Sequence, residues 1–194
     1  VFSHRTLEEG FDLVRDHGAD LVVMGWGPTS HHPAGRVEGS LDEVLGDLPA
    51  DFLLFKDRGF EPEHVLVPTA GGPDSDLAAE IASDLQRQFD SRITLLHVAD
   101  DEVAGEAFLE EWAKDHGLSE AELRVETGPV EPAIVDAADD ATLVISGATE
   151  RGLLSQLVGE SPVSDLVSDL DCSLISAERA RRRNLLQRLR DRLF

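Results

Sequence analysis

The sequence predicts an α/β domain with a doubly wound, mainly parallel sheet of five strands. From Glu63 onward, short apolar runs of strand length alternate with amphipathic stretches of helical length. Strands that alternate with helices form parallel sheets, because each connecting helix crosses back over one face of the sheet. Hydrophobic residues make up 41% of the chain, which is enough for the core of such a domain.

The alternation begins with a buried strand followed by a long helix. The apolar run His64–Val67 is ended by Pro68 and by the turn-forming glycines and proline of residues 71–73. We expect Asp74 or Ser75 to cap the helix that follows. Apolar residues recur every four positions along this helix and therefore lie on one face: Leu77, Ile81, Leu85 and Phe89.

Four more strands follow by the same rules. They are predicted at Arg92–Val98, Glu122–Glu126, Thr142–Ile145 and Cys172–Ile175. A helix over about 103–115 precedes the third strand of the unit, and two more helices precede the fourth and fifth. Their apolar faces consist of Phe108 and Trp112, then Val130, Ile134, Val135 and Ala138, and finally Val163, Leu166, Val167 and Leu170.

The first 60 residues repeat the end of this unit. Ala19–Gly25 aligns with Ala141–Gly147 at an offset of 122 residues, and Phe52–Phe55 repeats the final strand with a one-residue slip. We assign residues 1–60 to the C-terminal part of a first domain, 61–177 to a complete second domain and 178–194 to a basic amphipathic helix. Two or three strands cannot bury a parallel sheet alone. Either the natural protein continues upstream of Val1, or the first copy packs on the second copy or on another chain.

The charge of the chain is strongly acidic. It carries 39 Asp and Glu residues against 17 Lys and Arg, a formal net charge of -22. Such self-repulsion is screened within about 3 Å at 1 M salt, so the composition indicates a halophilic source. Nucleic acid is excluded as a partner, because its phosphates would be repelled.

The chain also lacks the signals of secretion and membrane insertion. No apolar run approaches the roughly 20 residues that cross a bilayer, and the start has no signal-peptide pattern. The single cysteine, Cys172, cannot form an internal disulfide and is expected to be a small core residue. These features predict a cytoplasmic protein in a reducing compartment.

Ligands of such sheets bind beyond the carboxyl ends of the strands. The loops at 68–74, 99–102 and 147–161 are therefore the candidates for a binding site. A glycine directly after a buried strand lets the backbone approach a ligand, and a serine that opens the next helix can hold phosphate.

Two of these loops resemble those of universal stress proteins. Val65–Thr69 followed by a glycine turn, and Leu143–Gly147 followed by a serine-initiated helix, look like the first and fourth strand ends of that family. The resemblance covers residues 63–176 as a full domain and 1–55 as the back half of another copy. It implies the adenine-nucleotide alpha-hydrolase-like fold, with one complete and one truncated copy.

The resemblance also implies an adenine-nucleotide site. In nucleotide-binding members the fourth loop reads Gly, two residues, Gly, nine residues, Gly, then Ser or Thr. Gly147 and Ser161 match the ends of this motif, whereas Glu150 and Glu160 replace its inner glycines and Ala70 replaces an aspartate that accepts a hydrogen bond from adenine. The candidate cofactor is ATP or another adenine nucleotide, and its site residues are Pro68, Thr69, Ala70, Val98, Gly147, Glu150, Glu160 and Ser161.

These substitutions rank regulation or assembly above ATP chemistry, because two carboxylates near a triphosphate repel it. Ser146 and Ser161 lack a neighbouring base, so no catalytic residues are expected beyond slow nucleotide turnover. We expect no metal site, since the adjacent His31 and His32 are poorly placed to chelate one ion. His97 is expected to be a hydrogen-bonded histidine at a strand end.

Residues 68–73 and 1–4 further resemble stress-protein pairs appended to amino-acid and cation permeases of haloarchaea. This resemblance implies the cytoplasmic domain of a membrane transporter. The preferred hypothesis is a regulatory module of that transporter, whose sheet edge and loops mediate homodimerisation and nucleotide sensing. Two alternatives stay open. The chain is a stand-alone ATP-binding stress protein with slow ATPase activity, or it is an assembly scaffold that binds no nucleotide.

The end of the chain is basic, in contrast to the rest. Seven arginines lie between residues 179 and 192, and four leucines between 185 and 193 form one helical stripe. Such a helix either lies on anionic lipid beside a transporter, or packs its leucines on this domain or a dimer mate while its arginines meet the acidic surface. We favour the second interpretation.

Overall fold

The computed structural model describes residues 7–25, 50–148 and 170–180. In chain order, the described elements are α1 (Leu7–His17), β1 (Leu21–Gly25), β2 (Asp51–Lys56), β3 (His64–Pro68), α3 (Pro73–Phe89), β4 (Arg92–Val98), α4 (Glu102–Asp115), β5 (Glu122–Glu126), α5 (Val130–Ala138), β6 (Leu143–Gly147) and β7 (Ser173–Glu178). No helix in this part of the chain is long and apolar enough to cross a membrane.

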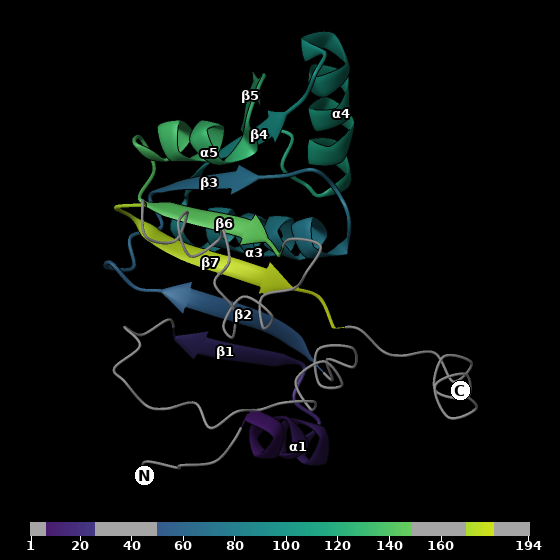
Figure 1. Cartoon of the computed structure of the whole chain (residues 1–194), viewed down its shortest axis with the longest axis vertical. Coiled ribbons are helices and arrows are strands. Elements are labelled where there is room, and N and C mark those ends of the chain that lie inside the picture. Colours follow the sequence, from purple (N-terminus) through teal and green to yellow (C-terminus); the bar gives the residue numbers. More distant parts are fainter. Residues whose placement is uncertain (1–6, 26–49, 149–169, 181–194) are drawn as a thin grey trace, which may run out of the picture.

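All described strands form one sheet in the order β1-β2-β7-β6-β3-β4-β5 (Figure 1). Every neighbouring pair is parallel except β2 and β7, which run antiparallel. The predicted doubly wound, mainly parallel sheet is confirmed. It has seven described strands rather than five, because β1 and β2 continue the same sheet beyond β7.

Helices cover the sheet on both faces and create two apolar cores. α3 and α4 pack on one face, where Val65 and Val67 of β3 point into the first core. α5 packs on the other face, where Leu66 of the same strand meets Ile134 in the second core. Alternate residues of β3 therefore enter opposite cores, as the period of a strand buried on both faces requires.

The start of α3 differs from the prediction. The helix begins at Pro73, with Gly72 as its N-cap and no side-chain cap, so Asp74 and Ser75 lie inside the first turn. Proline suits the first helical position because its missing N–H would have no partner there. The carboxylate of Asp74 instead accepts a hydrogen bond from the backbone N–H of Arg179, at 2.8 Å.

Three predicted core residues lie nearer the surface. Phe89 is 57% exposed at the end of α3, where its ring packs edge-on against Phe60. Val130 is 54% exposed because it is the first residue of α5. Cys172 precedes β7 and is half-buried at the border of the second core. The predicted apolar helix face at 163–170 lies outside the described residues, apart from the buried Leu170.

The internal repeat is an equivalence of whole elements. β1 and β2 match β6 and β7 at one constant offset of 122 residues, and α1 matches α5 at the same offset to within a residue at each end. The registers also agree, since Leu21 pairs with Asp51 and Leu143 pairs with Ser173. The one-residue slip predicted for the final strand is therefore wrong. At the constant offset of 122, Phe52 is equivalent to Leu174.

The two copies meet through the antiparallel pair of β2 and β7. Phe52 pairs with Glu178 and Lys56 pairs with Leu174, so the pairing runs the length of both strands. Both ends of this junction carry buried polar groups: Lys56 donates to the carbonyl of Leu170 at 2.7 Å, and Glu178 is 1% exposed. Strands β1 and β2 thus extend the sheet of residues 64–178 within the same chain. β7 also extends to Glu178, the first residue assigned to the basic tail.

Candidate functional site

The chain reverses its direction of winding between β3 and β6. These strands are neighbours in the sheet, with Val65 paired to Leu143 and Leu66 paired to Val144. The chain leaves β3 for β4 through α3 on one face, and it returns to β6 through α5 on the other. This is a topological switch point, beyond which open α/β sheets bind their ligands. Pro68 and Gly147 end the two strands at this point.

Thr69 is held by three hydrogen bonds at the end of β3. Its N–H donates to the carbonyl of Leu96 at 2.8 Å, and its Oγ1 accepts from the N–H of Gly71 at 3.1 Å. Its carbonyl accepts from Nδ1 of His97 at 2.8 Å. Because a carbonyl only accepts, Nδ1 of His97 is the donor of this bond. The predicted role of His97 as a hydrogen-bonded histidine at a strand end is confirmed.

A glycine turn joins this strand end to α3. Gly71 and Gly72 have φ angles of +78° and +90°, which side chains other than glycine rarely adopt. A β-carbon at Gly71 would lie 3.6 Å from the ring of Phe108, whereas one at Gly72 would meet no atom of the described residues within 4 Å. Phe108 in turn packs against His97, with ring centroids 4.5 Å apart. Within the described part of the chain, the turn is therefore closed towards α4 at Gly71 and open at Gly72.

Gly147 lies against the first turn of α3. A β-carbon there would stand 2.7 Å from the backbone nitrogen of Ser75 and 2.8 Å from the carbonyl carbon of Asp74. The sequence suggested that this glycine lets the backbone approach a ligand. The structure gives a different reason: the backbone of α3 passes too close to β6 for any side chain.

The remaining predicted site residues divide between the described and the undescribed parts of the chain. Ala70 is exposed directly after Thr69, and Val98 is half-buried at the end of β4, where it pairs with Glu126. Glu150, Glu160 and Ser161 lie outside the described residues. The structure thus brings Pro68, Thr69, Ala70, Val98 and Gly147 to the same carboxyl edge of the sheet.

A cluster that the sequence did not predict borders this edge. The guanidinium of Arg179 donates to Asp51 through Nη1 at 3.0 Å and to Glu80 through Nη2 at 2.6 Å. The N–H of Ala180 donates to Asp51 at 2.7 Å. The hydrogen bond to Glu80 raises the pKa of Arg179, and the charge of Asp51 adds to this effect. Nothing local in the sequence distinguishes these carboxylates from the others, and Arg179 belonged to the predicted tail.

The acidic side chains in the first turn of α3 bind groups outside the glycine turn. Asp74 accepts from the backbone of Arg179, as described above. Asp76 accepts from Nε1 of Trp112 at 3.3 Å and lies 3.1 Å from Nε2 of His116. These carboxylates therefore have partners of their own. Among residues 7–25, 50–148 and 170–180, no group of three or more His, Cys, Asp or Glu side chains is arranged to hold a metal ion.

A family model matches part of the sequence, and solved structures of known proteins share the fold. Residues 62–124 match the model of the universal stress protein family. No curated protein matches the sequence. A universal stress protein from Archaeoglobus fulgidus DSM 4304 superposes with a TM-score of 0.59 at 18% identity, over 87% of this chain and 64% of its own. This chain therefore spans less than two thirds of that protein's length.

Two other solved structures share the fold. A functionally unknown protein from Pseudomonas aeruginosa PAO1 superposes with a TM-score of 0.56 at 16% identity, over 91% of this chain and 69% of its own. A universal stress protein in complex with cAMP superposes with a TM-score of 0.51 at 20% identity, over 62% of this chain and 100% of its own.

Proposed function

We propose that this chain is a universal stress protein module that regulates a partner, and that its signal is an adenine nucleotide bound beyond β3 and β6. The observation that carries the proposal is the open glycine turn at a topological switch point, directly after the fixed Thr69. The family match supports it, because residues 62–124 span this strand and turn. A protein of the same fold binds cAMP.

The described part of the site favours weak binding. Thr69 and the turn after it offer a rigid frame with space at Gly72. Ala70 stands where a carboxylate would accept a hydrogen bond from adenine, so the base has one partner fewer. Losing one hydrogen bond to a charged group weakens binding by roughly tenfold or more. A site with such weak binding is occupied only at the high nucleotide concentrations found in cells.

Regulation fits these residues better than catalysis does. The histidine and the acids closest to the turn are all bound to other protein groups: His97 to Thr69, Asp74 to Arg179, and Asp76 to Trp112. A general base must be positioned on the proton that it removes, and these contacts hold the three side chains on other protein groups. The slow ATPase of a stand-alone stress protein is therefore the second candidate, and an empty scaffold is the third.

We also propose that a further strand and helix complete the first copy, as in a tandem protein. Leu21 and Val23 of β1 are 49% and 61% exposed, whereas Leu143 and Ile145, their equivalents in β6, are both 0% exposed. In the second copy, β3 pairs with β6 and α3 packs over it. A unit equivalent to β3 and α3 would bury the same positions of β1. A homodimer is the alternative source of that cover.

A module of this kind suits the cytoplasmic side of an amino-acid or cation transporter, in a cell with molar salt that screens the acidic surface. The basic segment 179–194 would then meet either the membrane surface or the protein's own carboxylates. Arg179, the first residue of this segment, supports contact with the protein's own carboxylates, because it binds Asp51 and Glu80.

Calorimetric titration of ATP, ADP and cAMP in molar KCl, with and without magnesium, tests the nucleotide signal. We expect a dissociation constant between roughly 0.1 and 1 mM for at least one of them. Ala70→Trp should abolish this binding by filling the turn, whereas Ser119→Trp, at an equally exposed position near the amino end of the sheet, should not. If the unaltered chain binds none of these nucleotides, the assembly scaffold is the only candidate function that remains.

A further inference from the structure

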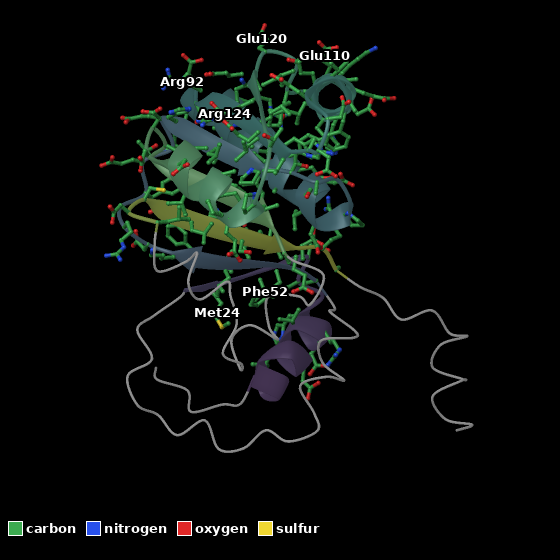
Figure 2. The ribbon with its side chains drawn as sticks, turned by 45° about the horizontal axis from the view of Figure 1, so that its top comes forward. Met24, Phe52, Arg92, Glu110, Glu120 and Arg124 are labelled. Atoms are coloured by element: carbon green, nitrogen blue, oxygen red, sulfur yellow. The ribbon has the colours of Figure 1, made fainter. Side chains whose placement is uncertain are left out.

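A hollow lies at the amino edge of the sheet, opposite the proposed nucleotide site. It has a volume of about 350 Å³ and is open to solvent. Its lining comes from the amino ends of β3, β4 and β5 and from the end of α5: His64, Arg92, Thr94, Glu122, Arg124, Ala137 and Asp140. Figure 2 shows Arg92 and Arg124 together at one end of the molecule, away from Met24 and Phe52 in the first copy.

Strand geometry explains the hollow. The register pairs His64 with Arg92 and Thr94 with Glu122, so the strand residues that line it share one face of the sheet. On this face α5 packs over β3 and β4 in the second core. Buried Thr94 and Ala137 form the floor, and longer charged side chains rise around them.

Two guanidinium groups in the hollow have unused donors. The contact of Arg92 is with Nδ1 of His64, at 3.0 Å, and it forms no ion pair with any described residue. Arg124 donates to Glu126 through Nε at 2.8 Å, and its two terminal nitrogens bond to no described residue. Acidic residues outnumber basic ones by more than two to one in this chain. An arginine without a carboxylate partner is therefore unexpected here.

Two carboxylates share the same hollow. Glu122 and Asp140 line it, yet within the described residues neither forms an ion pair with Arg92 or Arg124. The ring of His64 contacts the carbonyl of Asp140 and Oγ1 of Thr94 rather than either carboxylate. The hollow thus presents two positive and two negative groups that are left open towards its interior.

We propose that this hollow binds a small zwitterion of amino-acid size. The carboxylate of the ligand would accept hydrogen bonds from Arg92 and from the terminal nitrogens of Arg124, the planar groups that match a carboxylate best. Its ammonium group would lie between Glu122 and Asp140. A simple anion would meet these carboxylates, and a simple cation would meet the guanidinium groups. A ligand with both charges satisfies all four side chains, and 350 Å³ accommodates it.

NMR titration with glycine, L-alanine and L-glutamine tests the proposal, with acetate and methylammonium as the single-charge probes. The readouts are the ring signals of His64 and the amide signals of β4 and β5, at the lowest salt that keeps the chain folded. We expect at least one zwitterion to bind with a dissociation constant of about 1 mM, and both single-charge probes to bind at least tenfold more weakly.

Variants locate the site. Arg92→Gln and Glu122→Gln should each weaken zwitterion binding at least tenfold. Arg87→Gln and Glu110→Gln remove the same groups from exposed positions on α3 and α4 and should change nothing. Circular dichroism checks folding, and Arg124→Gln is the replacement if Arg92→Gln fails to fold. Equal binding of acetate, unchanged binding by Arg92→Gln, or no shift with any zwitterion would overturn the proposal. None of these results depends on nucleotide binding at the other edge.

Discussion

The backbone of Gly147 lies against the amide of Ser75, with room for no atom between them. A β-carbon at Gly147 would stand 2.7 Å from that nitrogen. Gly25 is the equivalent residue of the first copy, and the same added atom would meet no described atom within 4 Å there. One sequence feature, a glycine that ends a strand, therefore has two different environments in the repeat.

Replacement of each glycine by alanine measures this difference. Gly147→Ala should lower the free energy of unfolding by about 1 to 3 kcal/mol, because helix backbone must move to admit the methyl group. Gly25→Ala, the matched control, should change it by less than about 0.5 kcal/mol. Urea unfolding followed by circular dichroism gives both values. Equal effects of the two substitutions would mean that α3 does not press on β6.

A second matched pair of substitutions tests the solvent exposure of β1. Leu143 and Leu21 occupy equivalent positions, yet the first is 0% and the second 49% exposed. Leu143→Ala should cost about 2 to 5 kcal/mol through the cavity that it leaves, and Leu21→Ala less than about 1 kcal/mol. Comparable losses in urea unfolding of this chain would show that β1 is already covered. In a protein with a completed first copy, the cost of Leu21→Ala should rise.

The sequence predicted the strands well because their signals are local. The apolar cores of β3 and β6 are continuous runs, and a proline or a glycine ends each of them. Such runs are typical of strands buried on both faces, so their bounds in the structure differ from prediction by one or two residues. The loop ends Pro68, Thr69 and Gly147 could be placed at one edge for the same reason, since all parallel strands end there.

What the sequence could not give depends on tertiary register. Asp74 was a sound candidate for a helix cap, but its carboxylate binds the backbone of Arg179, 105 positions away. Asp51 and Glu80 are two of 39 acids, and only the pairing of β2 with β7 brings Asp51 to Arg179. The charged hollow is likewise invisible in the sequence, because its residues come from three strands and a helix end.

The cluster around Arg179 should stabilise the junction between the two copies. Arg179→Gln removes hydrogen bonds to Asp51 and Glu80, each worth about 0.5 to 1.5 kcal/mol because Glu80 is largely exposed and Asp51 partly buried, so the loss should be about 1 to 3 kcal/mol in total. Arg87→Gln is the control, because Arg87 pairs with Asp84 at the exposed surface of one helix. Its loss should stay below about 0.5 kcal/mol.

Salt distinguishes this explanation from a simple packing defect. Raising KCl from 0.1 M to 2 M should shrink the effect of Arg179→Gln, because the screening length falls from about 10 Å to below about 3 Å. Differential scanning calorimetry at both salt concentrations measures it. A loss that is independent of salt would point to packing of the arginine stem.

Burial raises the pKa of the Cys172 thiol, although the charge of Lys56 opposes this effect. The folded chain should therefore react with iodoacetamide more slowly at pH 8 than the unfolded chain, whose thiol ionises more readily. The unfolded thiol also loses its proton first as pH rises. Stability should accordingly be complete below the ordinary thiol pKa and fall above it. Cys172→Ser should remove this alkaline component, and a stability difference that does not vary with pH would contradict it.

Restoration of an acid beside Thr69 is the sharpest test of the proposed nucleotide site. Ala70 is exposed at the end of β3, so an aspartate fits there without disturbing the core. Its carboxylate would accept a hydrogen bond from the amino group of adenine, which guanine lacks at that position. Ala70→Asp should therefore tighten adenine-nucleotide binding about tenfold, a gain of about 1.4 kcal/mol, and leave guanine nucleotides unchanged or weaker.

The control adds the same charge away from the site. Ser119→Asp lies at an exposed position before β5, near the amino edge of the sheet, and should leave both affinities unchanged. Calorimetry with ATP and GTP in molar KCl compares the three proteins. A general loss of affinity in Ala70→Asp, equal for the two bases, would mean that the phosphates rather than the base lie beside residue 70. The nucleotide would then enter this edge in the opposite orientation, with the turn at Gly72 facing the base.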